Sequence, residues 1–550
     1  MQNQGSQTEE TVTLLLENKR FKINKKKLIK ESRYFATLLS TTYADHRLSE
    51  HCIKYEIPLI SFQDFIKWIN SDTHNAIKMD FERNDLGRLL ILLDLSVLFA
   101  VDNLTENITE ILEKYHLLPQ DVLTIWLLAQ ELGLKTLQDL CLAVCLDRFT
   151  ELPRNLIFKL SRQNFLRLVG NSNLRVPEES ELYLLPVAME WMQINQDTIP
   201  LDILKKTGPK VYSSIICYNG SNSSVNNEFY IHCWDGDKLF ELTTFKYPEA
   251  ITNNNAITGM QITARGHHLY LSGGEFGIGT GRFNTCVWRY SLITKRWFLE
   301  TVMPCARRHM IAAFLQNKLL LAGGVGHFRC KLQSLDIYNV HEGTWVKGAV
   351  LPMEFVTTPD YYVFDKKLII YIHNVKSGAL PIVYIYFCDS DEWYRVPIEI
   401  DHELRLDIRE LSETMPIKFK TASCYIDNNK PNRINLRTII ITCDNLEYRH
   451  EIYKKVNVSS DQDVSQVYFY LILSDNDLYK NNVLICLKNN NCTLLCLNAK
   501  KEKLQWHSIP IQNQDKFRSL SSHFADTIFF NLMDPANLHV MSATNLECTT

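Results

Sequence analysis

The amino-acid sequence predicts a multidomain protein: an α/β module, an all-α middle segment and an all-β propeller of about six blades. Three observations support this prediction. A Gly-Gly pair recurs 50 residues apart within residues 269–352, and each pair is followed by a Tyr and a Trp. Residues 113–206 form successive apolar stretches with helical spacing. Residues 10–112 combine short β-prone runs with helical ones.

The repeat is clearest in two successive units, in which Trp follows Tyr by seven residues. The first unit contains Gly273, Gly274, Tyr290 and Trp297, and the second contains Gly323, Gly324, Tyr338 and Trp345. Such a period indicates small sheets that stack, because one sheet cannot bury its own faces. We expect the glycines to allow close backbone approach and the aromatic rings to fill the space between neighbouring blades.

Outward from these units, the pattern predicts about six blades within residues 207–550. The fourth blade retains Tyr386 and Trp393 but has lost both glycines, and the fifth and sixth blades are also irregular. The tail at Asp526–Phe530 could supply a strand that closes the ring against the first blade and removes an open sheet edge. The pattern resembles the kelch repeat.

Residues 10–112 predict an α/β module. A hairpin is expected from Thr11–Leu16 and Arg20–Ile23, a helix over residues 27–40, a strand at Tyr55–Ile57, and apolar helices over residues 62–69, 86–100 and 104–112. The phrase Phe21-Lys-Ile-Asn24-Lys25-Lys-Lys-Leu28, followed by Ser32-Arg-Tyr34-Phe35, resembles the opening of a BTB domain, with Asn24 in place of the family histidine.

The BTB resemblance implies homodimerisation and binding to the ubiquitin-ligase scaffold cullin-3. The family's cullin-binding signature is an apolar residue, any residue and then Glu, and Tyr43-Ala44-Asp45 stands at the matching place. The resemblance therefore implies Tyr43 and Asp45 as contacts, although Asp is one methylene shorter than Glu. The alternative is that both residues belong to an ordinary loop.

Residues 113–206 predict a bundle of helix pairs. The phrases Leu127–Leu132 and Phe165-x-x-Leu168, with Trp191, resemble the BACK domain that follows BTB in kelch-like proteins. Cys141 and Cys145 have a spacing that suits a metal, but no second pair of ligands stands nearby in the sequence, so buried structural thiols are expected.

Candidate substrate-binding residues follow Met303-Pro304. They are Arg307, Arg308 and His309, together with Arg265 and His267 near the preceding repeat. In the kelch family, basic residues at the first place often face a partner-binding pocket, and such pockets take acidic peptide segments that suit an arginine fork. The alternative is a solvated loop, or arginines paired with neighbouring carboxylates.

Composition limits the class of protein. The formal charge of −3 gives no general attraction to nucleic acid or anionic membrane. No secretory signal is evident at the start, and the most apolar stretch, Leu89–Val101, is too short to span a bilayer. With fifteen cysteines, these features predict free thiols in the cytoplasm.

The motifs that resemble catalytic or cofactor-binding ones are not expected to function as such. Gly277-Ile-Gly279-Thr-Gly281 does not match a dinucleotide-binding loop and lies between predicted strands. Copper radical oxidases also use kelch-like propellers, but no His and Tyr ligand cluster is apparent, and no cofactor or metal is expected. The resemblance as a whole implies a non-catalytic substrate adaptor of a cullin-3 RING ubiquitin ligase. The alternative is a ligase-independent scaffold that binds actin or other cytoskeletal proteins.

Overall fold

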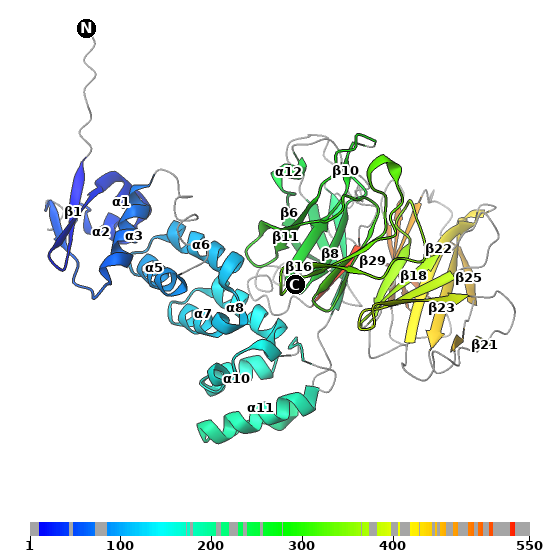
Figure 1. Cartoon of the computed structure of the whole chain (residues 1–550), viewed down its shortest axis with the longest axis horizontal. Coiled ribbons are helices and arrows are strands. Elements are labelled where there is room, and N and C mark those ends of the chain that lie inside the picture. Colours follow the sequence, from blue (N-terminus) through cyan, green and yellow to red (C-terminus); the bar gives the residue numbers. More distant parts are fainter. Residues whose placement is uncertain are drawn as a thin grey trace, which may run out of the picture. The chain divides into compact units, whose positions relative to one another are not determined.

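The chain divides into two compact units, with the boundary at residue 209, and each is described by itself (Figure 1). The computed structural model describes residues 10–42, 48–71, 85–171, 173–176, 180–204, 211–218, 229–234, 239–252, 257–277, 279–364, 366–372, 382–397 and the strands named below beyond residue 400.

The first unit opens with a three-stranded sheet in the order β2-β1-β3. Strands β1 (Thr11–Leu16) and β2 (Lys19–Asn24) form the predicted antiparallel hairpin, and β3 (Glu50–Cys52) runs parallel to β1. Glu17 and Asn18 alone make the turn, both with positive φ, of 48° and 68°. A two-residue hairpin turn of this hand matches the twist of the strands. The predicted strand at Tyr55–Ile57 is wrong, because the third strand forms earlier, at β3.

The predicted single helix over residues 27–40 is two helices, α1 (Lys25–Glu31) and α2 (Arg33–Leu38). Ser32 separates them in an extended conformation. Its hydroxyl accepts a hydrogen bond from the Phe35 amide at 3.1 Å and donates one to the Phe99 carbonyl at 2.6 Å. Ser32 therefore caps α2 and ties it to a distant part of the unit.

Three longer helices follow: α3 (Leu59–Asn70), α5 (Leu86–Leu98) and α6 (Asp102–Ile111). Phe35, Phe65 and Phe99 pack at the centre, with ring centroids 5.1–5.2 Å apart in the two pairs that involve Phe99. The guanidinium of Arg88 on α5 binds both oxygens of Asp64 on α3 at 2.5 Å, which joins these helices.

A helical region completes the first unit. Its elements are the π-helix η2 (Leu112–His116), α7 (Pro119–Glu131), α8 (Lys135–Asp147), the 3₁₀ turn η3 (Phe149–Glu151), α9 (Arg154–Ile157), α10 (Arg162–Val169), α11 (Ser180–Asn195) and the 3₁₀ turn η4 (Leu201–Leu204). Gly133, with φ of 68°, ends α7. Phe165 stacks on Trp191 at 4.6 Å, and the Trp191 indole donates to the Leu160 carbonyl at 3.1 Å, so α10 and α11 pack together.

The second unit is built of antiparallel sheets, and most of them are formed by strands that are consecutive in the sequence. Their strands, in spatial order, are β30 (Phe529–Met533), β4 (Val211–Tyr218), β5 (Phe229–Trp234) and β6 (Leu239–Phe245); β12 (Arg296–Val302), β11 (Cys286–Ser291), β9 (His268–Ser272) and β8 (Gln261–Arg265); β13 (Ile311–Leu315), β14 (Lys318–Ala322), β15 (Leu335–Asn339) and β16 (Thr344–Gly348); β17 (Asp360–Phe364), β18 (Lys367–Ile372), β19 (Ile382–Phe387) and β20 (Glu392–Pro397); β22 (Lys418–Asp427), β23 (Lys430–Thr442) and β25 (Glu451–Asn457); and β26 (Gln466–Tyr470), β27 (Asn482–Lys488), β28 (Thr493–Asn498) and β29 (Gln505–Ile509).

Shorter elements lie between these sheets. They are the helix α12 (Glu249–Thr252), the 3₁₀ turn η5 (His327–Arg329) and two short strand pairs, β7 (Ile257–Thr258) with β10 (Glu275–Phe276) and β21 (Arg405–Leu406) with β24 (Leu446–Glu447). Strand β30 comes from the end of the described chain yet pairs antiparallel with β4, through contacts such as Phe529 opposite Ile215. A strand therefore forms at the tail, three residues later than predicted, and it joins the first sheet.

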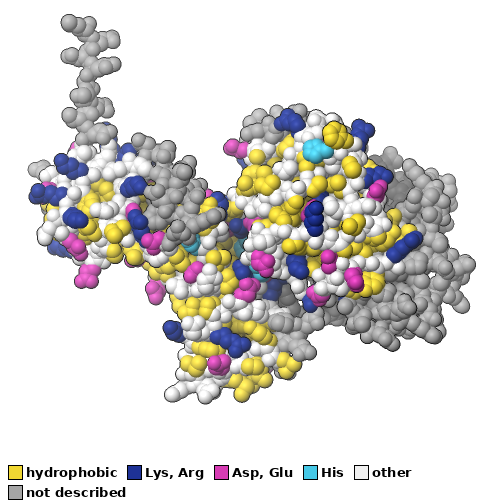
Figure 2. All heavy atoms as spheres, in the orientation of Figure 1, with side chains coloured by type: hydrophobic (Ala, Val, Ile, Leu, Met, Phe, Trp, Pro, Cys, Tyr) yellow, Lys and Arg dark blue, Asp and Glu magenta, His cyan; other side chains and the backbone are white. Residues whose placement is uncertain are grey.

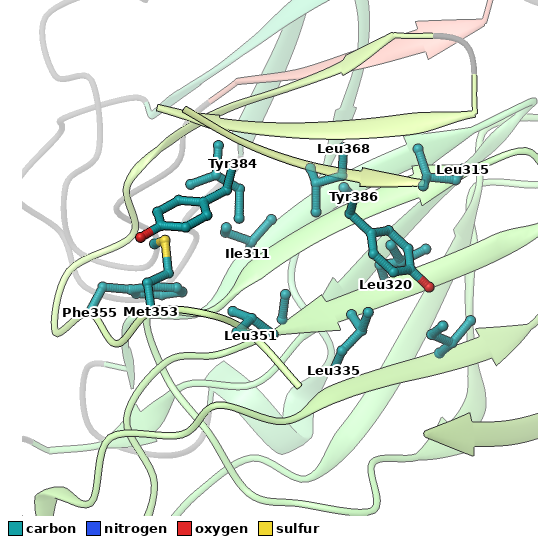
Figure 3. Close-up of a cluster of buried hydrophobic side chains, with 14 residues drawn as sticks. Ile311, Leu315, Leu320, Leu335, Leu351, Met353, Phe355, Leu368, Tyr384 and Tyr386 are labelled. Carbon is teal, nitrogen blue, oxygen red and sulfur yellow. The ribbon is translucent and has the colours of Figure 1, made fainter. Parts of the chain in front are cut away.

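The core of this unit lies between successive sheets. One cluster joins the β13–β16 sheet to the β17–β20 sheet, with Leu351, Met353 and Phe355 from the connecting loop packed between them (Figure 3). A second cluster joins the β8–β12 sheet to the β13–β16 sheet, and Met303 and Met310 from their connecting loop belong to it. Each connecting loop is thus held in place by apolar contacts with the two sheets that it joins.

Candidate protein-binding site

The repeated Tyr and Trp residues hold neighbouring sheets together. Their ring centroids lie 4.9 Å apart for Tyr290 and Trp297, 5.0 Å for Tyr338 and Trp345, and 5.0 Å for Tyr386 and Trp393. Each Trp indole N–H donates to the outer edge of the preceding sheet, where the acceptors are the Lys246 carbonyl at 2.7 Å, the Thr301 hydroxyl at 3.0 Å and the Ala349 carbonyl at 3.2 Å. These rings therefore belong to the scaffold that positions the loops.

The Gly-Gly pairs lie against the loops that lead into the next sheet. Gly273 and Gly324 have φ values of +68° and +91°, which disfavour residues with a Cβ. A Cβ at Gly273 would lie 2.7 Å from the Arg307 carbonyl oxygen, and one at Gly324 would lie 2.6 Å from that of Arg308. The glycines thus let the loop of residues 303–310 run close between two sheets.

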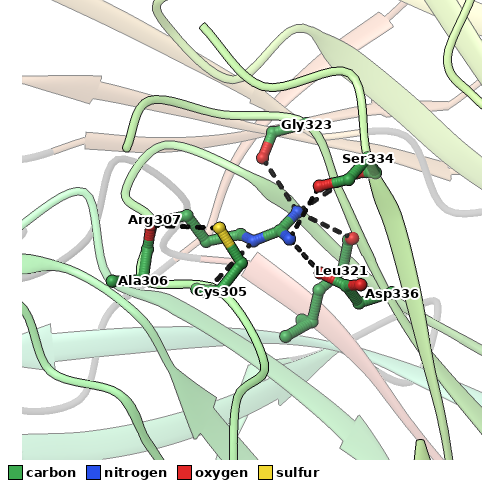
Figure 4. A network of polar contacts seen from close by, with 7 residues as sticks. All are labelled: Cys305, Ala306, Arg307, Leu321, Gly323, Ser334 and Asp336. Atoms are coloured by element: carbon green, nitrogen blue, oxygen red, sulfur yellow. Dashed lines mark hydrogen bonds and ion pairs between the residues drawn. The ribbon is translucent and has the colours of Figure 1, made fainter. Parts of the chain in front are cut away.

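Arg307 lies inside this loop and is fully buried (Figure 4). Its guanidinium forms an ion pair with buried Asp336 on β15. It also donates to the carbonyls of Leu321 at 3.1 Å and Gly323 at 3.2 Å, and to the Ser334 hydroxyl at 3.0 Å. The predicted contact of Arg307 with a partner is wrong for this arrangement, because its donors are turned into the protein and already engaged.

Arg308 and His309 are only partly buried. The Arg308 side chain is 11% exposed, and its Nε lies 3.3 Å from a Glu275 carboxylate oxygen. The other oxygen of that carboxylate accepts from the Gly281 amide at 2.8 Å. The Arg308 amide and carbonyl both pair with Val325, at 2.9 Å each. Loop 303–310 is therefore tied to loops 273–285 and 323–334 on either side.

We call the loops 273–285, 303–310, 323–334 and 349–359 the loop face. They lie at one end of the strands, since Arg308 contacts Glu275 and Val325, and Gly323 lies against Phe355. Arg265 and His267 lie at the other end, where Arg265 is the last residue of β8 and His267 belongs to the turn that joins β8 to β9. Strand β8 has five residues, which span about 17 Å. The structure therefore does not bring Arg265 and His267 together with Arg308 and His309.

Arg265 and His267 belong to a separate polar cluster. Arg265 donates to the Gln316 carbonyl at 2.5 Å and to the His341 imidazole at 3.2 Å. Arg289 contacts the His268 imidazole at 2.8 Å and Glu300 at 2.8 Å. Burial, together with His267, Arg289 and Arg265, holds the pKa of His268 well below its usual value. The cluster joins the turns of two sheets and presents neutral His268 as an acceptor.

Two residues, one beneath the loop face and one on it, could not be singled out from the sequence. Asp336, the partner of Arg307, precedes Tyr338 by two residues, but no local pattern connects it to a residue 29 positions earlier. Phe328 is a fully exposed aromatic at the tip of loop 323–334. The only signal is that it stands between His327 and Arg329 in a loop after a Gly-Gly pair.

Tyr43 and Asp45, the candidate cullin contacts, lie outside the described residues. Among the residues that are described, Cys141 and Cys145 are free buried thiols, and burial raises the pKa of both. Within the same set, no three His, Cys, Asp or Glu side chains are grouped to hold a metal ion. Every described helix is too short or too polar to cross a membrane.

One family match falls in the helical region. Residues 122–205, which include most of α7 and all of α8 to α11, match the family model described as BACK: BTB And C-terminal Kelch. Residues 122–205 form a BACK domain. No curated protein matches the chain.

The BACK domain follows the α/β part in the sequence and precedes the sheets. Its helices α7 to α11 carry the buried Cys141, Cys145 and Trp191. The sheet-rich region after the BACK domain is compatible with the kelch part of the family description. The chain is thus multidomain, with a helical BACK domain and a later series of antiparallel sheets.

Proposed function

We propose that this chain is a substrate-recognition adaptor of a cullin-3 RING ubiquitin ligase. The observation that carries the proposal is the BACK domain at residues 122–205, placed in sequence between an α/β part and a series of antiparallel sheets. This domain suggests a member of the BTB-kelch family, whose members commonly act as cullin-3 adaptors.

In this proposal, residues 10–112 are a BTB domain that dimerises and binds cullin-3 through Tyr43 and Asp45. Residues 207–550 are a six-bladed kelch propeller that captures the substrate protein. The pairing of β30 with β4 supports a closed ring, because the two ends of the region share one sheet. Arg308 and His309 are candidate substrate contacts. The protein catalyses no reaction itself. It acts in the cytoplasm by raising the local concentration of substrate at the ligase.

The test is complex formation between the full chain and purified cullin-3. We expect a complex at micromolar concentration that weakens when Tyr43→Ala and Asp45→Ala are combined. Lys54→Ala, an exposed change in the same unit, serves as the matched control. The absence of any complex would contradict the proposed adaptor function. A complex that survives the double change would leave the function and reject the two contacts.

A ligase-independent scaffold is the second candidate, and Asp45 is the observation that favours it. A shorter carboxylate in place of the family's Glu weakens the match at the cullin-binding place. Co-sedimentation of the full chain with actin filaments, together with no cullin-3 complex, would support this alternative.

A further inference from the structure

Phe328 is a large apolar side chain that lies fully in solvent, although a loop tip is normally occupied by a polar or small residue. It is the most exposed of the large apolar residues in the described chain. Its backbone has φ of 56° and ψ of 25°, and Arg329, the next residue, has φ of 58°. Two successive residues with a Cβ in the left-handed region are disfavoured, since glycine or asparagine would adopt it at lower cost. Such strain is concentrated at functional sites.

The loop that carries Phe328 is held firmly by its own backbone. The Gly326 amide donates to the Cys330 carbonyl at 2.8 Å, the Cys330 amide donates to the His327 carbonyl at 3.0 Å, and the Leu332 amide donates to the Gly324 carbonyl at 2.8 Å. These bonds close the loop below its tip. The backbone that carries Phe328 is therefore held in place, which reduces the backbone entropy lost on binding.

Neighbouring loops brace the tip. The His327 ring meets the Phe283 ring edge to face, with centroids 4.7 Å apart, and Phe283 belongs to loop 273–285 of the preceding sheet. Loop 303–310 pairs with Val325 at the base of the same loop. On the face shown in Figure 2, hydrophobic side chains stand among basic and acidic ones.

The loop face is also basic, unlike the chain as a whole. Its described residues include five cationic side chains, Arg282, Arg307, Arg308, Arg329 and Lys331, and two carboxylates, Glu275 and Glu354. Arg307 is neutralised by Asp336 below the surface, and Arg308 is paired with Glu275. Arg329 and Lys331 flank the tip and are exposed, and Lys331 is 3.6 Å from Glu354. A partner that meets Phe328 therefore meets positive charge around it.

We propose that Phe328 is a protruding anchor that inserts into an apolar pocket on a folded partner protein, with carboxylates at the rim of that pocket facing Arg329 and Lys331. The proposal rests on the proposed function of the sheets in partner capture. At this position the geometry is the reverse of the one expected from the sequence. The ring of this chain enters a pocket on the partner, whereas the sequence suggests an acidic peptide entering a pocket on this chain. Buried aromatic anchors and arginines are the residues that dominate binding energy at protein interfaces.

The test uses the full chain with a photo-crosslinking phenylalanine, benzoylphenylalanine, at position 328. Position 346 is the control, since Val346 is also apolar and exposed but lies on the outer strand β16. We expect crosslinks from 328 to a protein, with the attachment site in a segment that has apolar residues next to Asp or Glu. With that protein purified, Phe328→Ala should weaken binding about 30-fold or more, and Val346→Ala should not.

Phe328→Gly gives an independent readout. This change relieves the left-handed backbone, so it should raise the melting temperature while binding is lost. A residue needed only for the loop's structure would not show gain of stability together with loss of binding. Charge reversal of Arg329 and Lys331 to Glu should weaken the same complex and reduce its salt dependence.

The crosslinking results distinguish a failure of the Phe328 anchor from a failure of partner capture by the sheets. Crosslinks from 346 but not from 328 would overturn the anchor and leave partner capture intact. Crosslinks from neither position, with no bound protein, would count against partner capture by these sheets. Attachment to segments without carboxylates, or binding to phosphatidylserine vesicles that Phe328→Ala removes, would overturn an acidic protein as the partner.

Discussion

Arg307 is the residue whose role changes most between sequence and structure. In the sequence it is one of two adjacent arginines in a loop, which is typical of a surface contact. In the structure it is buried, paired with Asp336 and bonded to backbone carbonyls on both sides of loop 323–334. A buried guanidinium is tolerated only when its donors are satisfied, and these are.

Arg307→Ala should destabilise the sheets by about 3–5 kcal/mol, because Asp336 would be left as an uncompensated buried charge. Thermal and denaturant unfolding followed by tryptophan fluorescence would measure this loss. Lys347→Ala, a change at an exposed cation on β16, should stay within about 0.5 kcal/mol. An equal and small effect of both changes would show that the buried pair contributes little.

Arg307→Met combined with Asp336→Leu should recover most of the loss, since two apolar groups of similar size leave no unpaired charge. If the double variant is as unstable as Arg307→Ala, the hydrogen bonds to the Leu321, Gly323 and Ser334 carbonyls matter more than the ion pair.

His268 predicts a pH dependence at the opposite end of the strands. The groups that face it are His267, Arg265, Arg289, Tyr270 and, through Arg289, Glu300. Its folded-state pKa is lowered well below 6.5, so the unfolded chain binds the proton more tightly. The stability due to neutral His268 is therefore complete above pH 6.5 and is lost as the pH falls below that value.

Melting temperatures between pH 8 and pH 5 would test this dependence. His268→Gln should flatten the part of the decline that lies below pH 6.5, whereas His327→Gln, a change at an exposed histidine on the loop face, should leave it unchanged. The same decline in wild type and His268→Gln would assign the pH effect to other groups.

The Gly-Gly pairs occupy places where neighbouring atoms leave no room for a Cβ. Gly324→Ala places a Cβ at 2.6 Å from the Arg308 carbonyl and at 2.9 Å from the Met310 amide nitrogen, and both neighbours are backbone atoms that cannot move aside. Gly279 has a similar φ, +81°, but a Cβ there would meet nothing within 4 Å. The two positions differ mainly in the space around them.

Gly324→Ala should therefore cost more than Gly279→Ala, by about 1–3 kcal/mol, since only the first change adds a clash to the strain of positive φ. Unfolding midpoints of both variants would measure the difference. Equal costs would mean that φ alone, and not the close approach of loop 303–310, requires glycine at position 324.

The sequence could predict elements whose cause is local. The hairpin at the N-terminus, the end of α7 at Gly133 and the seven-residue spacing of Tyr and Trp depend on residues close to one another. The break between α1 and α2 has a local part, because Ser32 caps the Phe35 amide, but the bond of its hydroxyl to the carbonyl of Phe99, 67 residues later, could not be predicted. Arg307 was misplaced for the same reason, since Asp336 lies on another strand.

At the scale of the whole molecule, the second unit depends on a contact between its two ends. Strand β30 adds to the edge of β4, so the sheet that contains the first strands after residue 209 is completed by residues near the end of the chain. An unpaired β4 would expose a row of backbone donors and acceptors, which is a template for pairing with another chain. The whole series of sheets is therefore expected to depend on the last described strand.

A chain that ends at residue 528 lacks β30, whereas a chain that ends at residue 533 keeps it. We expect the shorter chain to self-associate through the open edge of β4 and to lose hydrogen-exchange protection in β4 and β5, because completion of the sheet by β30 covers that edge. The longer chain should elute like the full protein and keep its protection. If the 528-residue chain elutes and exchanges like the 533-residue chain, the pairing of β30 with β4 does not hold the first sheet, and the closed propeller in the proposed function would lose its main support.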